Sequence, residues 1–156
     1  MYKFNSPRMA TVGLVAVGAA LAAAVATATA GPVEEANKKI VLDFYRVVLN
    51  GRDADAAPKY VADSYVQHNP RVADGLAGLQ GFVRELGRVA PDAHADVVHV
   101  VAEGELVVLH SHTQRNPQDR GMAQVDIFRV HDGKISEHWD VIQPVPETSV
   151  NGNGMF

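Results

Sequence analysis

The period of the hydrophobic residues changes at Pro91, and this change limits the fold more than any other feature of the sequence. Before Pro91, apolar residues recur at steps of three and four positions, as Ile40, Phe44 and Val48 do, which is typical of amphipathic helices. After Pro91, apolar residues recur at every second position, which is typical of strands. Helices that precede the strands indicate an α+β domain in which the helices cover one face of a sheet.

Three helices and one short extended segment are expected before Pro91. The first helix starts with two glutamates, which the helix dipole favours there, and it ends at Asn50-Gly51. Pro58 interrupts the second helix, and Asn69-Pro70 stops the extended segment because a residue before proline avoids helical angles. The expected helices are Val33–Leu49, Asp53–Val61 and Leu76–Val89, and the extended segment is Ser64–His68.

Four or more strands are expected after Pro91, in an antiparallel meander. His131-Asp132-Gly133 is a strong hairpin signal between the last two strands, and Gly104 marks the turn between the first two. The expected strands are Ala95–Ala102, Glu105–Thr113, Gly121–Val130 and Lys134–Ile142.

The first thirty residues read as a separate segment. Lys3 and Arg8 are their only charges, an apolar run starts at Met9, and Ala28-Thr29-Ala30 fits an A-x-A cleavage site. The sequence therefore predicts a signal peptide at 1–30 and an exported protein, periplasmic or secreted. The alternative is an uncleaved N-terminal membrane anchor. One domain is expected at 31–147, followed by a flexible tail at 148–156.

Composition excludes two classes of function. Beyond the leader the chain has 12 basic and 18 acidic residues, and this acidic balance argues against binding to nucleic acid. The chain has no cysteine and therefore no thiol nucleophile. Apart from the leader, nothing in it predicts contact with a membrane.

Ionisable side chains interrupt the apolar pattern of the last three strands. Alternation places Gln124, Asp126 and Phe128 on one face, and it places His138 and Asp140 together on the next strand. We expect Gln124, Asp126, Asp140 and His110 to converge on the side that the helices cover. Both faces of the sheet are substantially apolar, so a second subunit is expected to cover the other.

Each of these residues also has a plainer interpretation. Asp126 fits pairing with an arginine, and Asp140 fits a solvated position near a strand end. His110 and His112 fit a structural role, or a weak metal site together with Asp126. An ionised carboxylate is costly to bury, so inward aspartates require partners or a small wet cavity.

Two stretches resemble the SnoaL-like polyketide cyclases, within the nuclear transport factor 2-like superfamily that also includes the ketosteroid isomerases. They are Tyr65-Val66-Gln67-His68-Asn69-Pro70 and the run from Asp126 to Asp140, DIFRVHDGKISEHWD. The resemblance covers nearly all of 34–146. It implies a cone-shaped domain of three N-terminal helices packed on a strongly curved antiparallel sheet. It also implies a homodimer formed through the sheet and a deep apolar pocket.

The resemblance implies roles for individual residues. Asp140 matches the aspartate that acts as acid and base in an aldol condensation that needs no metal and no cofactor. Gln124 matches a glutamine that holds substrate oxygens, whereas Asp126 stands where the cyclases have a histidine. His68 is expected to restore a proton donor and to pair with Asp126, so the expected catalytic residues are Asp140, Asp126 and His68. The remaining substrate contacts are expected from His110, Tyr65, Phe128 and Trp139.

The sequence thus predicts a protein with a pocket for a small apolar carbonyl compound. The first hypothesis is acid–base chemistry at the carbon next to the carbonyl, as in an aldol-type cyclase, a lyase or an isomerase. The alternative is a non-catalytic exported module that binds small molecules in the same pocket. A third reading is an interaction domain whose sheet pairs with other partners.

Overall fold

The computed structural model describes residues 31–156, so the predicted signal peptide lies outside the described residues. The described part starts with helix α1 (Pro32–Phe44), which continues directly into a π-helical turn, η1 (Tyr45–Asn50). A short 3₁₀ helix, η2 (Ala54–Lys59), and helix α2 (Gly75–Val89) follow, separated by strand β1 (Val61–Gln67). No helix within residues 31–156 is long and apolar enough to cross a membrane.

Strands β2 (His94–Glu103), β3 (Leu106–Gln114), β4 (Met122–His131) and β5 (Lys134–Pro144) form the predicted meander. The sheet has five strands in the order β1-β5-β4-β3-β2. Strand β1 runs parallel to β5, so the prediction of a purely antiparallel sheet is wrong and the sheet is mixed. The extended segment predicted at Ser64–His68 overlaps the end of β1.

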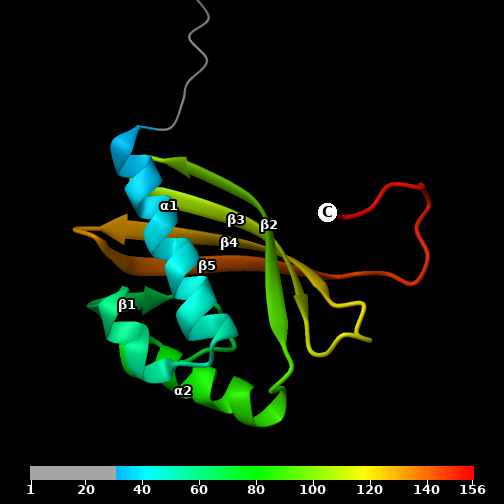
Figure 1. Ribbon diagram of the computed structural model, residues 1–156, viewed down its shortest axis with the longest axis horizontal. Coiled ribbons are helices and arrows are strands. Elements are labelled where there is room, and N and C mark those ends of the chain that lie inside the picture. Colours follow the sequence, from blue (N-terminus) through cyan, green and yellow to red (C-terminus); the bar gives the residue numbers. More distant parts are fainter. Residues whose placement is uncertain (1–30) are drawn as a thin grey trace, which may run out of the picture.

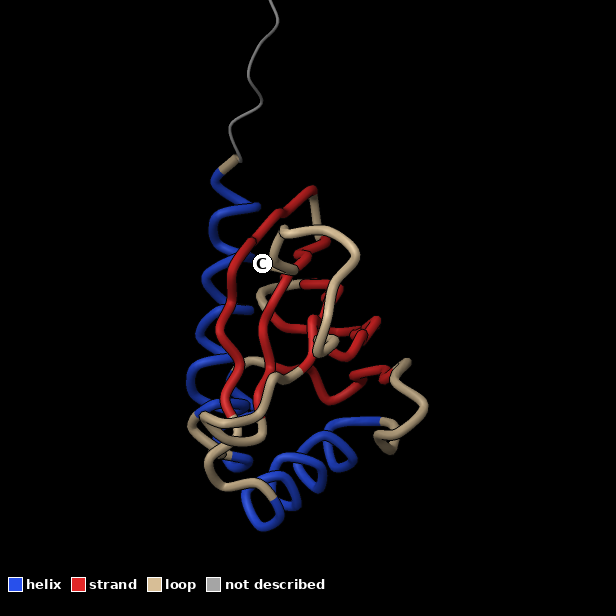
Figure 2. Tube along the Cα trace, turned by 90° about the vertical axis from the view of Figure 1, so that its right-hand side faces the viewer, coloured by secondary structure: helices blue, strands red, loops and turns tan. Residues whose placement is uncertain are grey.

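The helices lie on one side of the sheet, and the sheet bends around them (Figures 1 and 2). Helix α1 crosses the long strands, and α2 closes the lower end beside β1 (Figure 1). The expected second helix is only the 3₁₀ helix, in which Pro58 lies. A proline inside a helix removes a backbone donor, which accounts for the short element.

The core forms between the helices and the inner face of the sheet. Val41 and Val48 from the α1–η1 segment and Val107, Leu109 and Ile135 from the strands are fully buried there. The π-helical turn inserts an extra residue into the helical repeat, and Tyr45 and Val48 of this turn face the core.

The pairing register decides which polar residues share the inner face. Leu109 of β3 lies opposite Asp126 of β4, and Asp126 lies opposite Asp140 of β5. Because paired residues point to the same side, both aspartates lie on the face that the helices cover. His110 pairs with Val125 and therefore lies on the outer face.

Candidate active site

A cavity of about 220 Å³ lies between the helices and the inner face of the sheet. Most of its accessible wall is apolar, although eight of its fifteen lining residues have polar side chains. The lining residues with apolar side chains are Phe44, Leu49, Val72, Leu79, Phe82, Phe128 and Ile142. The lining residues with polar side chains are Tyr65, Gln67, Asn69, Arg71, Gln124, Asp126, His138 and Asp140.

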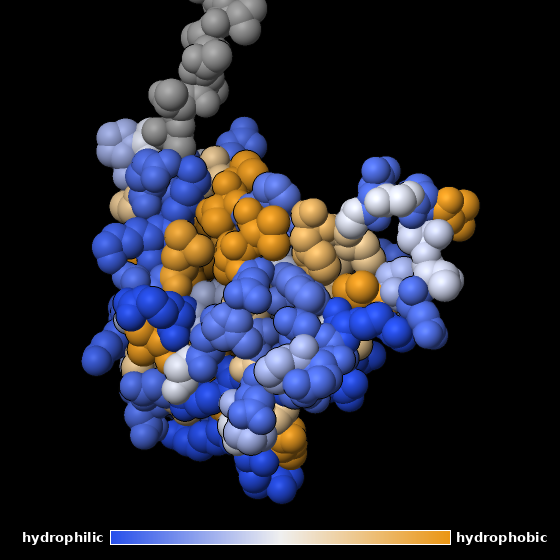
Figure 3. Space-filling view, turned by 45° about the vertical axis from the view of Figure 1, so that its right-hand side comes forward, coloured by the Kyte–Doolittle hydropathy of each residue, from blue (hydrophilic) through white to orange (hydrophobic). Residues whose placement is uncertain are grey.

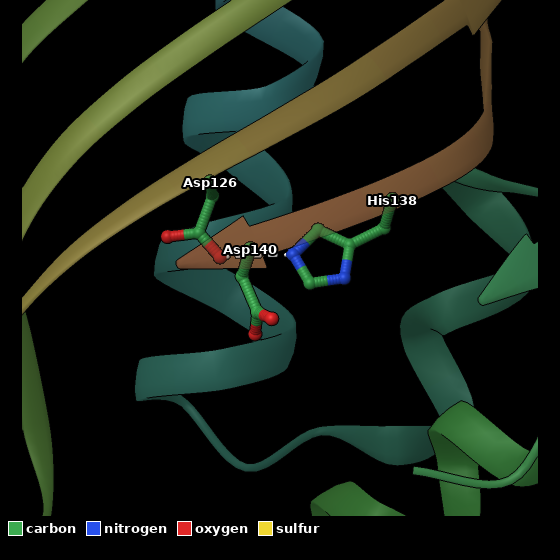
Figure 4. A group of neighbouring side chains, drawn as sticks. All are labelled: Asp126, His138 and Asp140. Carbon is green, nitrogen blue, oxygen red and sulfur yellow. Dashed lines mark hydrogen bonds and ion pairs between the residues drawn. The ribbon is translucent and has the colours of Figure 1, made fainter. Parts of the chain in front are cut away.

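Asp126 and His138 form a buried pair in this cavity (Figure 4). Nε2 of His138 lies 2.9 Å from Oδ1 of Asp126, and the exposed fractions of the two residues are 8% and 2%. Strands β4 and β5 position the pair: His138 lies opposite Phe128, and its ring stacks on the Phe128 ring with centroids 4.7 Å apart. The charged groups are therefore enclosed by apolar neighbours.

Hydrogen bonds determine where the protons of this pair lie. Nδ1 of His138 is 2.9 Å from Oε1 of Gln67, which also accepts the backbone N–H of Asn69, so Nδ1 must donate. Oδ1 of Asp126 accepts Nε2 of Gln124 at 2.7 Å and is also the oxygen that lies against Nε2 of His138. One proton thus lies between His138 and Asp126, in a buried hydrogen-bonded pair.

Tyr45 also forms a hydrogen bond with Asp126. Its hydroxyl donates to Oδ2 of Asp126 at 2.5 Å. Burial raises the pKa of Tyr45 well above its usual value, and the neighbouring Asp126 charge raises it further. The hydroxyl therefore stays protonated, and Asp126 receives donors from Tyr45, Gln124 and His138.

Asp140 lies beside this network but is bonded differently. Its Oδ2 accepts Nδ2 of Asn69 at 2.5 Å, which ties the loop after β1 to strand β5. It has no hydrogen bond or ion pair to a cationic side chain among residues 31–156. Asp140 is thus a half-buried carboxylate whose charge is not neutralised by a direct partner.

Tyr65 offers an unused donor to the same cavity. Its hydroxyl accepts Nε2 of Gln67 at 2.9 Å, and no acceptor for its own proton lies among the described residues. Burial raises the pKa of Tyr65 above its usual value, and the charges of Asp126 and Asp140 add to the shift. A neutral hydroxyl with a free proton is suited to donate to an oxygen of a bound molecule.

Three side chains of this site are close enough to share a metal ion. One potential ligand atom each from Asp126, His138 and Asp140 lies within 4.8 Å of the others. The donor set of one imidazole and two carboxylates suits several divalent ions. However, Nε2 of His138 donates to Asp126 in this arrangement, so an ion would have to break that bond and displace its proton.

The structure brings five of the eight predicted site residues to the cavity. They are Tyr65, Gln124, Asp126, Phe128 and Asp140. The predicted pair between Asp126 and a histidine exists, but its partner is His138 rather than His68.

The other three predicted residues lie elsewhere, and their placement in the site is wrong. His68 follows Gln67 at the end of β1, points away from the cavity and stacks on Trp139, with ring centroids 4.6 Å apart. Trp139 pairs with Ile127 and so lies on the outer face. His110 also lies there, with Nδ1 3.2 Å from Nδ1 of His99. Strand alternation explains all three positions, because each residue is next in the sequence to one whose side chain points inward.

Five polar residues of the site were not predicted: Tyr45, Gln67, Asn69, Arg71 and His138. Alternation places His138 on the face of Asp140, and the same rule places Gln67 with Tyr65, so both could have been found. Asn69 lies in the loop after β1, and no local sequence pattern predicts its hydrogen bond to Asp140. Tyr45 appears in the sequence as one apolar residue of a helix stripe, and its acceptor lies 81 positions away.

Comparisons with known proteins agree on the fold. Among solved structures, TsrD from Streptomyces laurentii is 20% identical and has a TM-score of 0.59, with 69% of this chain and 88% of that one covered. A protein of Jannaschia sp. CCS1 described as a SnoaL-like polyketide cyclase is 18% identical, with a TM-score of 0.62 and coverages of 74% and 90%. An NTF2-like protein of Cytophaga hutchinsonii is 18% identical, with a TM-score of 0.58 and coverages of 69% and 90%.

These structural likenesses show the shared fold, an α+β domain with a curved mixed sheet. A search of curated protein sequences finds no significant match. The family model described as SnoaL-like polyketide cyclase matches residues 39–147, which is more than half of the chain. With this match, and with the inward carboxylates of β4 and β5, the chain belongs to the SnoaL-like polyketide cyclase family.

Proposed function

We propose that this protein catalyses acid–base chemistry at a carbon next to a carbonyl group, as in an aldol-type cyclase, a lyase or an isomerase. One observation carries the proposal. An apolar cavity holds a carboxylate without a cationic partner, Asp140, together with a hydroxyl that has an unused proton, Tyr65. A base and a hydrogen-bond donor are the two groups that such a reaction needs.

In the proposed reaction, an oxygen of Asp140 removes the proton from the carbon next to the carbonyl. The electrons of the broken C–H bond move onto the carbonyl oxygen, and the hydroxyl of Tyr65 donates to the resulting enolate oxygen. In an aldol reaction the enolate carbon then attacks a second carbonyl, and protonated Asp140 gives its proton to the alkoxide oxygen that forms. In an isomerisation the conjugated enolate takes the proton of Asp140 at a different carbon. Either route regenerates the carboxylate of Asp140.

Asp126 has a supporting role in this scheme. Its two oxygens are held by three side chains, Tyr45, Gln124 and His138, whereas Asp140 accepts one hydrogen bond, from Asn69. One atom each of Asp126 and His138 lies within 4.8 Å of an oxygen of Asp140, so the pair borders the position at which Asp140 would act.

Exchange of the proton next to the carbonyl for deuterium in D₂O tests the proposal directly. A panel of aryl and alkyl ketones is incubated with the protein, and exchange is followed by NMR. The wild type should accelerate exchange of at least one panel member above the rate in buffer. Tight binding of ketones with no acceleration would support instead the non-catalytic binding module.

Tyr65→Phe should lower the exchange rate about a hundredfold, because a donor aimed at a developing oxyanion contributes most in the transition state. Binding of the ketone should change little. Since burial raises the pKa of Tyr65, the wild-type rate should show no loss near pH 10, the usual pKa of a tyrosine. Steady-state rates from pH 6 to pH 10.5 measure both effects.

Tyr60→Phe is the matched control for this variant. Tyr60 is half-buried, does not line the cavity, and makes no side-chain hydrogen bond in residues 31–156. Equal rates for the two variants would exclude Tyr65 as the donor.

We also propose that a second copy of the chain covers the outer face of the sheet. Val101, Val125 and Val141 are exposed there, the last two directly opposite each other on β4 and β5. Figure 3 shows hydrophobic side chains gathered between the start of α1 and the C-terminal tail, whereas polar side chains cover much of the lower half. Light scattering should give the mass of a dimer, and the mass of one chain would contradict this.

A further inference from the structure

Arg71 is the only arginine of residues 31–156 without a carboxylate or carbonyl partner for its side chain. It lies in the loop between β1 and α2 and lines the cavity that holds Asp140. Each of the other arginines bonds to a protein oxygen; they are Arg46, Arg52, Arg84, Arg88, Arg115, Arg120 and Arg129.

The loop holds Arg71 in place at the opening. Its backbone N–H donates to Oδ1 of Asn69 at 2.8 Å, and the side-chain amide of the same Asn69 donates to Asp140. The loop is fixed further where Asp74 accepts the backbone N–H of Gln67 at 2.8 Å. A guanidinium on a fixed backbone is better suited to bind a ligand than one on a mobile loop.

A second hollow of about 270 Å³ adjoins the cavity, and Arg71 belongs to both. The hollow shares Asn69, Arg71, Asp140 and Ile142 with the cavity, and it is otherwise lined by Pro70, Met122 and Pro144. Arg71 and Asp140 thus border the same opening, yet they form no ion pair with each other. The opening presents an unpaired positive group and an unpaired negative group to the same bound molecule.

We propose that the substrate carries a carboxylate, which Arg71 binds in the hollow while the carbonyl carbon chain enters the apolar cavity beside Asp140. This inference rests on the proposed function, because it places the reacting carbon at Asp140. A guanidinium binds a carboxylate through two parallel hydrogen bonds. Arg71 also offsets the repulsion that Asp140 would exert on an incoming anion.

The geometry favours a carboxylate over a phosphate group. Arg71 is the only cationic side chain that lines the hollow, and Asp140 lies on its border. A phosphate dianion would meet one positive and one negative side chain there, which gives little net attraction. The proposed substrate occupies the cavity of about 220 Å³ and the hollow of about 270 Å³, which together lie at the lower part of the roughly 300–1,000 Å³ range of small-molecule sites and suit a small oxo acid.

A matched pair of probes tests the inference: 4-oxo-4-phenylbutanoate and its methyl ester, titrated into the protein by calorimetry. The wild type should bind the acid about tenfold more tightly than the ester, because a hydrogen-bonded charge pair contributes about this much at a partly exposed site. Arg71→Gln should remove this preference and leave ester binding unchanged. Inorganic phosphate should not displace the acid.

Arg84→Gln is the control, since it makes the same change on the outer side of α2, where Arg84 pairs with Asp55 and lines neither cavity. It should bind both probes as the wild type does. Equal binding of acid and ester, no binding of the acid, or displacement by phosphate would each overturn the inference. Deuterium exchange of the ester in the same samples separates this inference from the proposed function. If the protein exchanges the ester but does not prefer the acid, the carboxylate site is refuted and the proposed function stands. If it prefers the acid but exchanges nothing, the proposed function alone is refuted.

Discussion

Replacing Asp126 with alanine should lower the free energy of unfolding by about 3–5 kcal/mol, the range for removing one partner of a buried ion pair. The change leaves the ring of His138, whose exposed fraction is 8%, without its partner. It also leaves the hydroxyl of Tyr45 and the amide of Gln124 without their acceptor. Urea denaturation followed by the fluorescence of Trp139, the only tryptophan, measures the loss.

Asp96→Ala is the matched control, because Asp96 also pairs with a histidine, His94, but on the exposed part of strand β2. A solvated pair contributes little, so this variant should stay within about 0.5 kcal/mol of the wild type. The double variant Asp126→Leu/His138→Leu should recover part of the loss, since apolar side chains often replace a buried ion pair at small cost. Equal losses for Asp126→Ala and Asp96→Ala would show that the pair is not buried as described.

Asp140→Asn should lower the rate of deuterium exchange by about two to four orders of magnitude, the usual contribution of a general acid or base. The asparagine keeps the shape of the side chain but cannot accept a proton at neutral pH. Ketone affinity should stay close to that of the wild type, because the apolar walls of the cavity are unchanged. Exchange rates and titrations on the same preparation separate the loss of chemistry from a loss of binding.

Asp132→Asn provides the control for this change. Asp132 lies at the exposed tip of the β4–β5 hairpin with φ of 48°, a backbone conformation that asparagine tolerates well. This variant should exchange at the wild-type rate. If Asp140→Asn keeps more than about a tenth of the activity, another group is the base and the proposed reaction scheme fails.

The sequence predicts the β4–β5 hairpin well because its signals are local. The turn His131-Asp132-Gly133 predicts that the two strands pair, and alternation within each strand predicts that Asp126 shares a face with Phe128 and that Asp140 shares a face with His138, as the structure has them. The role expected of His68 rests on the family resemblance, and His110 is expected to converge with Asp126 and Asp140. The position of each along its strand nevertheless turns its side chain outward.

Long-range pairing accounts for most of what the sequence does not predict. Strand β1 joins the sheet by lying parallel to β5, and the register of this pair is interrupted between Val61 and Val66. No local sequence pattern predicts that β1 pairs with β5, so Gln67 could not be placed beside His138. Tyr45 belongs to the apolar stripe of a helix, where tyrosine and phenylalanine fit equally well. The pattern therefore does not predict the hydrogen bond of its hydroxyl.

The hairpin also contains a bulge, and this has a consequence for aligning relatives. Val130 pairs with Ile135 but Arg129 pairs with Glu137, which leaves Ser136 as an extra residue on β5. Counting outward from the turn without this residue would set Trp139, not Asp140, against Asp126. Alignments of distant members should therefore be anchored on the facing position of the neighbouring strand, because anchoring them on the turn assigns the acid to the wrong column wherever the bulge is gained or lost.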